Sequence, residues 1–536
     1  MRAVPAVVIA APASGSGKTT VATGLIGALR RAGHRVAPFK VGPDYIDPGY
    51  HGLAAGRPGR NLDPVLVGAE RVVPLYRHGA DGCDLAVVEG VMGLFDGRID
   101  ENQSAAIAEG STAQVAGLLG APVILVVDAR GHSQSLAALL HGFATFDAAI
   151  RLGGVILNRV GSERHDQVLR AACDRVGLPV LGSLPRMSEL EVPSRHLGLI
   201  PAVEHGPAAT AAVEAMTNLV AAHVDLAAIA RLADSTVTGP AWDPVTAVRA
   251  AAQSASERAA LAGSSASRPE AGSRGATAGP GDGVAMGLGR TDDSGVARAA
   301  GAGEVTAGVV ARGFGEGMFS VTAGAAAGFE PVIAMAGGAA FTFGYAEHRE
   351  LLVAAGARVV VFDPLQDELP TGTAGLVLPG GFPEEHAAAL AANARLLAQV
   401  GAQVRAGLPV HAECAGLLYL ARSLDGHPMA GVVDATAEFG PRLTLGYRDA
   451  VALADSPLWR AGERVRGHEF HRTRLVARGD DTAAWGWHVG GDRIREGALV
   501  HRVHASYLHT HPAGNPEATS RFVTTATRYA NARAAT

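Results

Sequence analysis

The sequence has few cysteines, little net charge and no long uninterrupted apolar run. Its 536 residues contain three widely separated cysteines, Cys83, Cys173 and Cys414, and no C-x-x-C pair. This spacing excludes a disulfide framework or a zinc finger and is typical of a reducing compartment. The formal charge of −5 gives no electrostatic basis for nucleic-acid binding.

The apolar stretch near the N-terminus is also short. Glycines and Lys18 interrupt it well before the length that a membrane span requires. We therefore expect a soluble, cytoplasmic protein that has neither a membrane nor a nucleic acid as a partner.

A chain of this length is too long for one hydrophobic core, and its patterning indicates two α/β domains. Residues 1–234 and residues 329–530 alternate short apolar runs with helical stretches, which predicts in each domain a mainly parallel sheet with helices on both faces. The strands expected in the first domain are Ala6–Ala10, Val36–Val41, Leu85–Glu89, Val123–Asp128 and Gly154–Asn158, with helices at Thr19–Ala32 and Ser133–Phe143. The strands expected in the second are Val332–Ala336, Arg358–Phe362, Leu376–Leu378, Val410–Glu413 and Ala498–Val503, with helices at Glu347–Ala355 and Glu384–Ala406.

Residues 235–328 differ from both domains in composition. Ala, Gly, Ser, Pro and Asp dominate Ser254–Gly303, and large apolar residues are rare. Such a segment buries too little surface to offset the entropy lost on ordering. We predict a flexible low-complexity linker with one helix near Asp243–Ala262.

A phosphate-binding loop is predicted after the first strand, at Ser14–Thr20. The glycines allow backbone N–H groups to approach phosphate oxygens, Lys18 can bridge the terminal phosphates, and the Thr19 hydroxyl can ligate Mg²⁺. Pro12 stands where the strict pattern has its first glycine, and an ordinary loop is the alternative. The residues expected to bind ATP are Gly15, Ser16, Gly17, Lys18, Thr19 and Thr20.

Acidic residues follow the next two strands. Because the carboxyl ends of parallel strands share one crevice, Asp44 and Glu89 are expected to hold Mg²⁺ together with Thr19. Asp47 and Asp96 either orient an acceptor or occupy ordinary turns. Asn158 ends a further strand and either reads adenine or makes a strand-end hydrogen bond.

Cys414 lies between the short apolar run at Val410–Glu413 and a helical pattern. On such a turn the helix N-terminus favours a thiolate, which is a strong nucleophile towards amide carbons. A buried structural cysteine is the alternative.

Histidines that could serve as the base follow in two clusters, His468/His471 and His504/His509/His511. If His509 and His511 lie on one strand, both point to the same face, so spacing alone does not separate them. Zinc binding and solvated histidines are the alternatives. Gly380 and Gly381 can aim backbone N–H groups at an oxyanion, or form only a tight turn.

Together these segments resemble the cobyrinate/hydrogenobyrinate a,c-diamide synthase family of glutamine-dependent amidotransferases in cobalamin biosynthesis. The resemblance covers Val7–Ala230 and Phe329–Tyr529 and includes the imperfect phosphate loop. The blocks that carry it are Ser14–Thr20, Lys40–Pro48, Val88–Gly97, Val155–Arg159, Leu378–Gly381, Ala412–Leu417, Gly467–His471 and Ala505–His509.

The resemblance implies a role for each domain. The first would be a dethiobiotin-synthetase-like P-loop domain that binds MgATP and a corrinoid tetracarboxylate, with Asp44, Tyr45, Ile46 and Asp96 at the acceptor site. The second would be a class I glutamine amidotransferase domain. There Cys414 would attack glutamine, His509 would activate the thiol, and Gly381 and Ala415 would hold the oxyanion.

The implied reaction amidates the a- and c-acetate carboxylates through acyl phosphates, with ATP as phosphoryl donor and glutamine as nitrogen donor. The chain departs from many class I amidotransferases in following His509 with Thr510-His511-Pro512 rather than Pro-Glu, which leaves the third member of a triad unassigned. Cobyric acid synthase, a nickel-tetrapyrrole amidotransferase, and a P-loop switch ATPase with an inactive amidotransferase domain remain alternatives. The sequence leaves open the presence of cobalt, the order of amidation and the oligomeric state, a homodimer among the choices.

Overall fold

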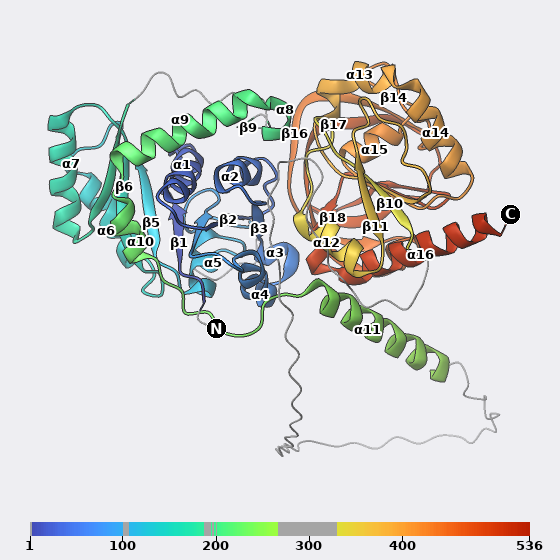
Figure 1. Cartoon of the computed structure of the whole chain (residues 1–536), viewed down its shortest axis with the longest axis horizontal. Helices are drawn as coiled ribbons and strands as arrows, with labels where there is room; N and C mark the ends of the chain where they lie inside the picture. Colours follow the sequence, from blue (N-terminus) through green and yellow to red (C-terminus); the bar gives the residue numbers. More distant parts are fainter. Residues whose placement is uncertain are drawn as a thin grey trace, which may run out of the picture. The chain divides into compact units, whose positions relative to one another are not determined.

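The computed structural model describes residues 3–99, 107–186, 194–195, 198–199, 201–265 and 330–535. Met1–Ala255 and Gly328–Thr536 belong to one compact unit, and Ser256–Ala327 to a second. Most of the expected linker, residues 266–328, lies outside the described residues. Within the first unit, both predicted α/β domains are present (Figure 1).

The first domain is built on a seven-stranded parallel sheet in the order β3-β2-β4-β1-β5-β6-β7. Four of the five expected strands have the predicted bounds, and the fifth is longer at both ends. The strands are β1 (Ala6–Ala10), β2 (Val36–Val41), β3 (Arg60–Leu62), β4 (Leu85–Glu89), β5 (Val123–Asp128), β6 (Leu152–Val160) and β7 (Val180–Pro185).

Helices cover both faces of this sheet, as the near-continuous apolar strands predict. Val7 and Ile9 of β1 enter the core on one face, and Val8 and Ala10 enter the core on the other. The first core includes residues of α1 (Lys18–Arg31), α2 (Asp47–Ala55) and α9 (Pro207–His223). The second includes residues of α4 (Ala69–Gly79), α5 (Thr112–Leu119), α6 (Leu136–Thr145) and α7 (Glu163–Val176).

The expected linker begins at residue 235, but the structure packs the residues that follow against the first domain. Trp242 is 8% exposed, and its backbone N–H donates to Pro74 O at 2.8 Å. Its ring meets His78 edge-on at 5.0 Å. The helix expected near Asp243–Ala262 is α11 (Pro244–Ser265). One large aromatic side chain therefore anchors the start of the expected linker to the first domain.

The second domain contains the predicted sheet, in the order β11-β10-β12-β13-β21-β20. Its strands are β10 (Val332–Ala336), β11 (Arg358–Phe362), β12 (Thr373–Leu378), β13 (Val410–Glu413), β20 (Ala498–Val500) and β21 (Val503–Ser506). The single strand expected at Ala498–Val503 is wrong: β20 and β21 form an antiparallel pair, and His501 adopts a left-handed φ of 52° at the turn.

The single helix expected at Glu384–Ala406 is also divided. It consists of η1 (Pro383–His386), α13 (Ala387–Ala392) and α14 (Ala394–Arg405). The Asn393 side chain accepts from Leu396 N at 3.3 Å and so caps α14. Its amide group donates to Pro364 O at 3.0 Å, which fixes the break against a neighbouring loop. The other helices are α12 (Ala346–Ala354), α15 (Ala415–Leu420) and α16 (Pro516–Ala534).

A second, mostly antiparallel sheet of this domain was not among the predicted elements. It is centred on the long pair β16 (Ala435–Ala452) and β17 (Arg464–Arg478). The sheet also contains β14 (Ser423–Leu424), β15 (His427–Pro428), β18 (Trp485–Val489), β19 (Asp492–Glu496) and β22 (His509–Thr510). It pairs β22 with β17, which places His509 opposite His468.

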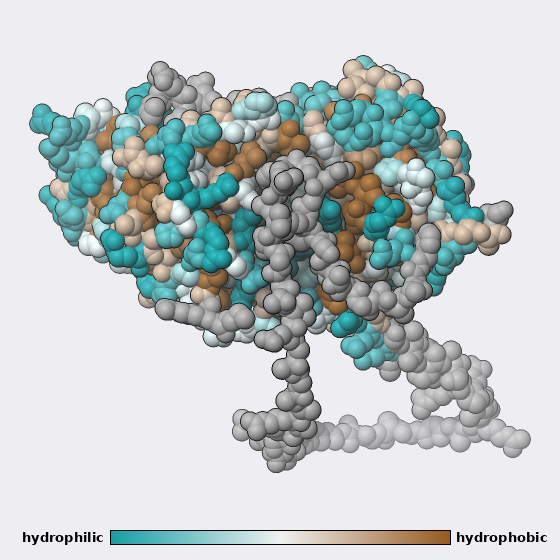
Figure 2. Space-filling view, in the orientation of Figure 1, coloured by the Kyte–Doolittle hydropathy of each residue, from teal (hydrophilic) through white to brown (hydrophobic). Residues whose placement is uncertain are grey.

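Hydrophilic and apolar residues alternate over the face of the molecule shown in Figure 2. Among the described helices, none has the length and hydropathy needed to cross a bilayer.

Candidate active site

The predicted phosphate loop joins β1 to α1, as a nucleotide-binding turn requires. Gly15 and Gly17 have left-handed φ angles of 77° and 96°. A Cβ at Gly17 would stand 2.2 Å from Asn158 Nδ2, so this position needs glycine for close approach as well as for its backbone angle. Thr20 follows in the first turn of α1. The loop therefore presents its backbone at the start of a helix, where N–H groups are free to bind an anion.

Side chains from the end of β6 support this loop. Asn158 Nδ2 donates to Ser16 O at 2.9 Å, and Arg159 Nη1 donates to Gly15 O at 2.9 Å. The hydroxyl of Ser16 donates to Ala13 O at 2.9 Å. Of the two interpretations of Asn158, these contacts favour the strand-end hydrogen bond, while adenine recognition remains a prediction.

Lys18 is buried beside the loop, and its Nζ donates to Met92 O at 2.6 Å. Burial, with a smaller effect from Lys40, lowers the pKa of the Lys18 ammonium. The next residue, Thr19, donates its hydroxyl to Glu89 Oε1 at 2.7 Å and lies 3.2 Å from Asp47 Oδ2. The loop thus leads directly into an acidic cluster.

A second lysine lies inside this cluster. Lys40 Nζ donates to Asp47 Oδ2 at 2.6 Å and to Glu89 Oε1 at 2.9 Å. Burial alone would lower the pKa of Lys40, but the two carboxylates outweigh it and raise the pKa. Burial likewise disfavours ionised Glu89, yet Lys40 and His51, whose Nε2 lies 2.7 Å from Glu89 Oε2, hold the pKa of Glu89 below its ordinary value. The positive charge of Lys40 and the negative charges of Asp47 and Glu89 therefore compensate one another within the cluster.

Asp47, rather than Asp44, is the aspartate that the structure brings to Thr19 and Glu89. Asp44 Oδ1 accepts instead from Ile46 N at 2.7 Å and from Asp47 N at 3.0 Å. Asp44 thus stabilises the turn that leads into α2. Lys40 begins the block Lys40–Pro48 and Asp47 stands next to its last residue, so this block was the signal from which the pair could have been found.

The other residues expected at the acceptor site lie in different surroundings. Ile46 is 5% exposed and packs in the core with α1 and α2. Asp96 Oδ2 accepts from Gly93 N at 3.0 Å and so closes a turn. The ring of Tyr45 lies 5.2 Å from that of His509, in the second domain. The side chains of Ile46, Asp96 and Tyr45 thus make three different sets of contacts.

Cys414 stands on the predicted turn between β13 and α15. Its φ of 46° and ψ of −97° are strained for a residue with a side chain. The backbone N–H of Cys414 donates to Ser506 O at 2.7 Å, and Leu418 N donates to Cys414 O at 3.2 Å. These two bonds hold the thiol at the end of β13.

Burial opposes the thiolate that the turn and the helix N-terminus were expected to favour. Cys414 is 2% exposed, and burial, reinforced by Glu384, raises the pKa of its thiol. The N–H of Ala415 acts in the opposite direction but does not prevail, because α15 is only six residues long and contributes a short dipole. The thiol is protonated at neutral pH and requires a base when it attacks.

His509, and not His511, lies beside the nucleophile strand. His509 is fully buried, and its Nδ1 lies 3.7 Å from Glu413 Oε2. His511 instead accepts from Ala513 N through Nδ1 at 3.3 Å and contacts the Tyr345 ring at 4.1 Å. Burial lowers the pKa of His511 to about 4, so this imidazole is neutral at physiological pH.

Glu413, which directly precedes Cys414, is the carboxylate nearest to this base. Its Oε1 accepts from Thr510 N at 3.1 Å and from Thr510 Oγ1 at 3.0 Å, and lies 3.2 Å from His411 Nε2. Burial would disfavour its ionised form, but His411 and His509 outweigh burial and hold the pKa of Glu413 well below its usual value. Glu413 is thus an ionised, fixed carboxylate, and its position next to Cys414 was the only sequence signal for it.

The glycine turn after β12 packs against the same centre. A Cβ at Gly380 would stand 2.4 Å from His509 Cε1, and one at Gly381 would stand 2.2 Å from Ala340 O. Phe343 N donates to Gly380 O at 3.0 Å. The turn therefore needs glycine for close approach, and the role of Gly381 and Ala415 as oxyanion donors remains a prediction.

The remaining histidines of the two clusters are spread over several contacts. His468 stacks on His509 at 5.0 Å, His471 stacks on Tyr507 at 3.8 Å, and His504 contacts Trp485 at 5.1 Å. In the part of the chain that the structure describes, no group of three His, Cys, Asp or Glu side chains is arranged to hold a metal ion.

A buried ion pair lies on β16 and β17, near the thiol. Arg448 Nε donates to Glu469 Oε2 at 2.6 Å, and both side chains are largely buried. Glu469 directly follows His468. It also raises the pKa of the Cys414 thiol, with a smaller effect than burial or Glu384. Arg448 also lines a cavity of about 510 Å³ together with Thr473. Glu469 belongs to the block Gly467–His471, but the sequence alone does not reveal its role because its partner Arg448 lies on another strand.

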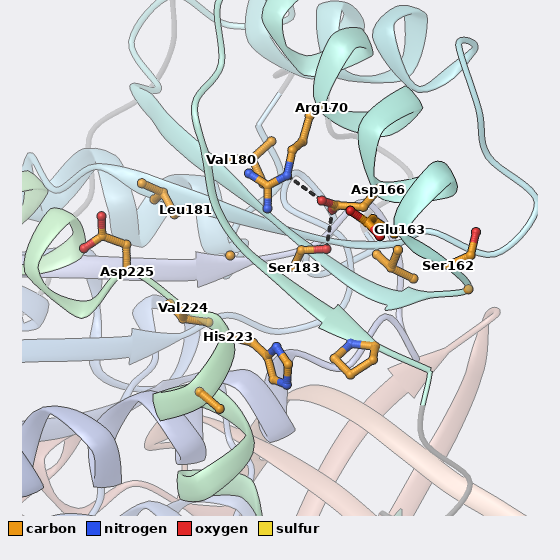
Figure 3. A pocket seen from close by; sticks show the side chains of 15 residues that line it. Ser162, Glu163, Asp166, Arg170, Val180, Leu181, Ser183, His223, Val224 and Asp225 are labelled. Atoms are coloured by element: carbon orange, nitrogen blue, oxygen red, sulfur yellow. Dashed lines mark hydrogen bonds and ion pairs between the residues drawn. The ribbon is translucent and has the colours of Figure 1, made fainter.

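A larger cavity of about 840 Å³ lies beside β7 and α7 (Figure 3). There Asp166 accepts from Ser183 Oγ at 2.5 Å and from Arg170 Nε at 2.6 Å. None of the residues predicted for the phosphate, acceptor or thiol sites lines it.

The two domains contact each other through polar and apolar groups. Arg60 of β3 pairs with Glu347 at 2.6 Å and with Glu350, both on α12. Tyr447 donates its hydroxyl to Asp63 Oδ2 at 3.0 Å. The nucleotide-loop and thiol domains thus form one compact unit.

Comparison with known proteins matches each domain separately. Residues 7–200 match the CobQ/CobB/MinD/ParA nucleotide binding domain, and residues 332–516 match the CobB/CobQ-like glutamine amidotransferase domain. Among solved structures, a glutamine amidotransferase is 21% identical and covers 36% of this chain and 98% of its own, with a TM-score of 0.27.

Several curated relatives match along almost their whole length. Hydrogenobyrinate a,c-diamide synthases of Mycobacterium bovis and Streptomyces coelicolor are 55% and 53% identical, each over 97% of both chains. The cobyrinate a,c-diamide synthase of Gloeobacter violaceus is 37% identical over 97% of this chain and 96% of its own. With its nucleotide-binding loop and its Cys414 centre, the chain belongs to the a,c-diamide synthase family of glutamine-dependent amidotransferases.

Proposed function

We propose that this chain amidates the a- and c-acetate carboxylates of hydrogenobyrinate, with glutamine as the nitrogen donor and ATP as the phosphoryl donor. The relatives that are 55% and 53% identical carry the name of this reaction. The observation that carries the proposal is that a buried Cys/His/Glu centre and a phosphate loop occupy one compact unit.

The phosphate loop supports activation of the acceptor. Transfer of the terminal phosphoryl group of ATP to a carboxylate oxygen gives an acyl phosphate and ADP. Lys18 and the backbone of Gly15–Lys18 would hold the phosphates during this transfer. Attack of ammonia on the acyl carbon then forms the amide and releases phosphate, a leaving group that the free carboxylate lacks.

The acidic cluster next to the loop fits Mg²⁺. Thr19, Asp47 and Glu89 offer a hydroxyl and two carboxylates, which are the hard oxygen donors that this cation takes alongside phosphates and water. When bound, Mg²⁺ would neutralise charge on the transferring phosphoryl group. In the present conformation the Lys40 ammonium supplies the positive charge between the same carboxylates. We therefore assign Asp47, in place of Asp44, to the metal site.

The second domain supports release of ammonia from glutamine. Cys414 would attack the side-chain amide carbon and pass its proton to His509, ammonia would leave, and water would hydrolyse the resulting thioester to glutamate. We propose Glu413 as the third member, which stabilises the imidazolium formed during attack. Gly381 and Ala415 would hold the oxyanion.

The Arg448–Glu469 pair supports recognition of the amino-acid end of glutamine. A guanidinium can bind the α-carboxylate, and a carboxylate can bind the α-ammonium group. The cavity lined by Arg448 and Thr473 offers an approach to this pair. Tyr507 stacks on His471. It directly follows Ser506, whose carbonyl oxygen accepts a hydrogen bond from Cys414 N.

The overall proposal is tested with both candidate corrinoid substrates. Incubation with MgATP, glutamine and either hydrogenobyrinate or cobyrinate should add two amides to hydrogenobyrinate, as read from the product mass. The Cys414→Ser variant should lose glutamine-dependent product by at least about a hundredfold, whereas saturating ammonium should restore it. If ammonium fails to restore it, the proposed division of labour between the two domains is wrong.

The Glu413→Gln variant tests the third member. Because a neutral amide stabilises the imidazolium less than a carboxylate does, kcat for glutamine hydrolysis should fall about 10- to 100-fold, with little change in KM for glutamine. The ammonium-dependent rate should stay near that of the wild type, which separates this effect from misfolding. An unchanged kcat would remove Glu413 from the mechanism.

The Arg448→Ala variant tests recognition of the α-carboxylate. Its kcat/KM for glutamine should fall about 10- to 100-fold, as expected for loss of a charge-assisted contact. Hydrolysis of 4-aminobutanamide, which lacks that carboxylate, should be equally slow in both proteins. Arg422→Ala is the matched control, because Arg422 pairs with Asp434 in the same domain but does not line the cavity of Arg448 and Thr473. Equal losses with both amides would contradict the assignment.

The metal assignment is tested by comparing Asp47→Asn with Asp44→Asn. Asp47→Asn should raise the Mg²⁺ concentration for half-maximal activity at least about tenfold, measured with ammonium as nitrogen donor so that Cys414 is not involved. Asn at position 44 can still accept from the backbone, so Asp44→Asn should change this concentration little. The reverse order of effects would restore Asp44 as the ligand.

A further inference from the structure

The segment Lys40–Asp47 contacts both reaction centres. Its first and last residues meet at the acidic cluster, where Lys40 Nζ and Thr19 Oγ1 both contact Asp47 Oδ2. Tyr45, in the middle of the turn, packs against the second domain. Its ring stacks on Phe343 with centroids 5.0 Å apart and planes 6° apart, and it lies 5.2 Å from the ring of His509.

The aromatic contacts surround the base from several sides. Tyr45 also lies 4.8 Å from Tyr345 and 5.6 Å from His468, and His468 in turn stacks on His509. His509 is fully buried. The Tyr45 ring is therefore one of the groups that pack against the His509 imidazole.

Hydrogen bonds hold the turn that carries Tyr45 in a fixed shape. Asn61 Nδ2 donates to Gly42 O at 2.8 Å and to Asp44 O at 2.7 Å. Asp44 Oδ1 accepts from the next two backbone N–H groups of the turn, those of Ile46 and Asp47. A segment tied in this way moves as one piece rather than absorbing a displacement at its ends.

The acidic cluster also connects this segment to the proposed metal site. In the structure the Lys40 ammonium lies between Asp47 and Glu89, the carboxylates to which we assign Mg²⁺. Two positive charges would not share that position, so binding of Mg²⁺ by Asp47 and Glu89 would require the Lys40 ammonium to leave it. Lys40 and Asp47 are the ends of the segment, so a rearrangement of either residue would act on the turn that carries Tyr45.

We propose that the segment Lys40–Asp47 couples the nucleotide site to the glutaminase centre, with Tyr45 as a positioning residue for His509. Occupation of the nucleotide site changes the packing of Tyr45 on His509 and thereby the reactivity of Cys414. Ammonia is then released when the carboxylate can be activated. This inference rests on the proposed function, since it assigns the regulation of the same two sites.

The first test measures the reactivity of Cys414 directly and needs neither the corrinoid substrate nor glutamine. Alkylation of Cys414 by iodoacetamide is measured with and without MgATP, with Cys83 and Cys173 replaced by alanine. MgATP should change the wild-type rate about fivefold or more, and should leave the rate unchanged in Tyr45→Ala. Tyr45→Phe, which keeps the ring, should behave like the wild type.

Tyr447→Phe is the matched control for general loosening of the domain contact. It removes the hydrogen bond to Asp63 but leaves residues 40–47 intact. MgATP should still change the alkylation rate in this variant. An equal loss of the response in Tyr447→Phe and Tyr45→Ala, or a response retained in Tyr45→Ala, would overturn the proposal.

The second test uses the full reaction. The ratio of glutamate released to amide formed should be near one in the wild type and should rise at least about threefold in Tyr45→Ala, consistent with loss of coupling between two sites. If the wild type forms no amide on hydrogenobyrinate, the proposed function fails. If it forms amide and Tyr45→Ala keeps the wild-type ratio, only the coupling inference fails.

Discussion

The buried ammonium of Lys40 is the interaction on which the nucleotide end of this protein depends. Lys40 is 4% exposed and lies 2.6 Å and 2.9 Å from the carboxylates of Asp47 and Glu89. A buried charge is tolerated only when opposite charges and hydrogen bonds compensate it, and loss of one partner typically costs about 3–5 kcal/mol. The ammonium therefore ties β2, β4 and α2 together around Thr19. Because Lys40 and Asp47 bound the turn that carries Tyr45, the same interaction also determines where that ring meets the second domain.

The glutaminase centre combines burial with a strained backbone. Burial keeps the Cys414 thiol protonated, while the left-handed φ of this residue holds it at the end of β13. Reaction then requires transfer of the proton to a base that is held in place, and the contact of His509 with Glu413 provides this arrangement. A centre of this kind is inert until substrate and neighbouring groups are in position. That property suits an enzyme whose ammonia would otherwise be lost to water.

Local patterns predicted the parallel sheets well. β1, β2, β4, β5, β10, β11 and β13 have the expected bounds because each is a short apolar run between turn residues. The pair β16 and β17 was missed, since buried and exposed residues alternate along both strands and some stretches are exposed throughout. The break at Asn393 and the turn at His501 depend on a single cap and a single backbone angle within otherwise continuous patterns.

The sequence by itself determined the chemistry of this protein: a phosphate loop between a strand and a helix, a cysteine on a strand-to-helix turn, and histidines and glycines in the order of one family. Only the tertiary structure decided between chemically equivalent residues. It placed Asp47 rather than Asp44 at Thr19, brought His509 rather than His511 to Glu413, and set Tyr45 against His509. These contacts join residues far apart in the chain. They depend on strand order, register and domain packing, which spacing along the sequence does not encode.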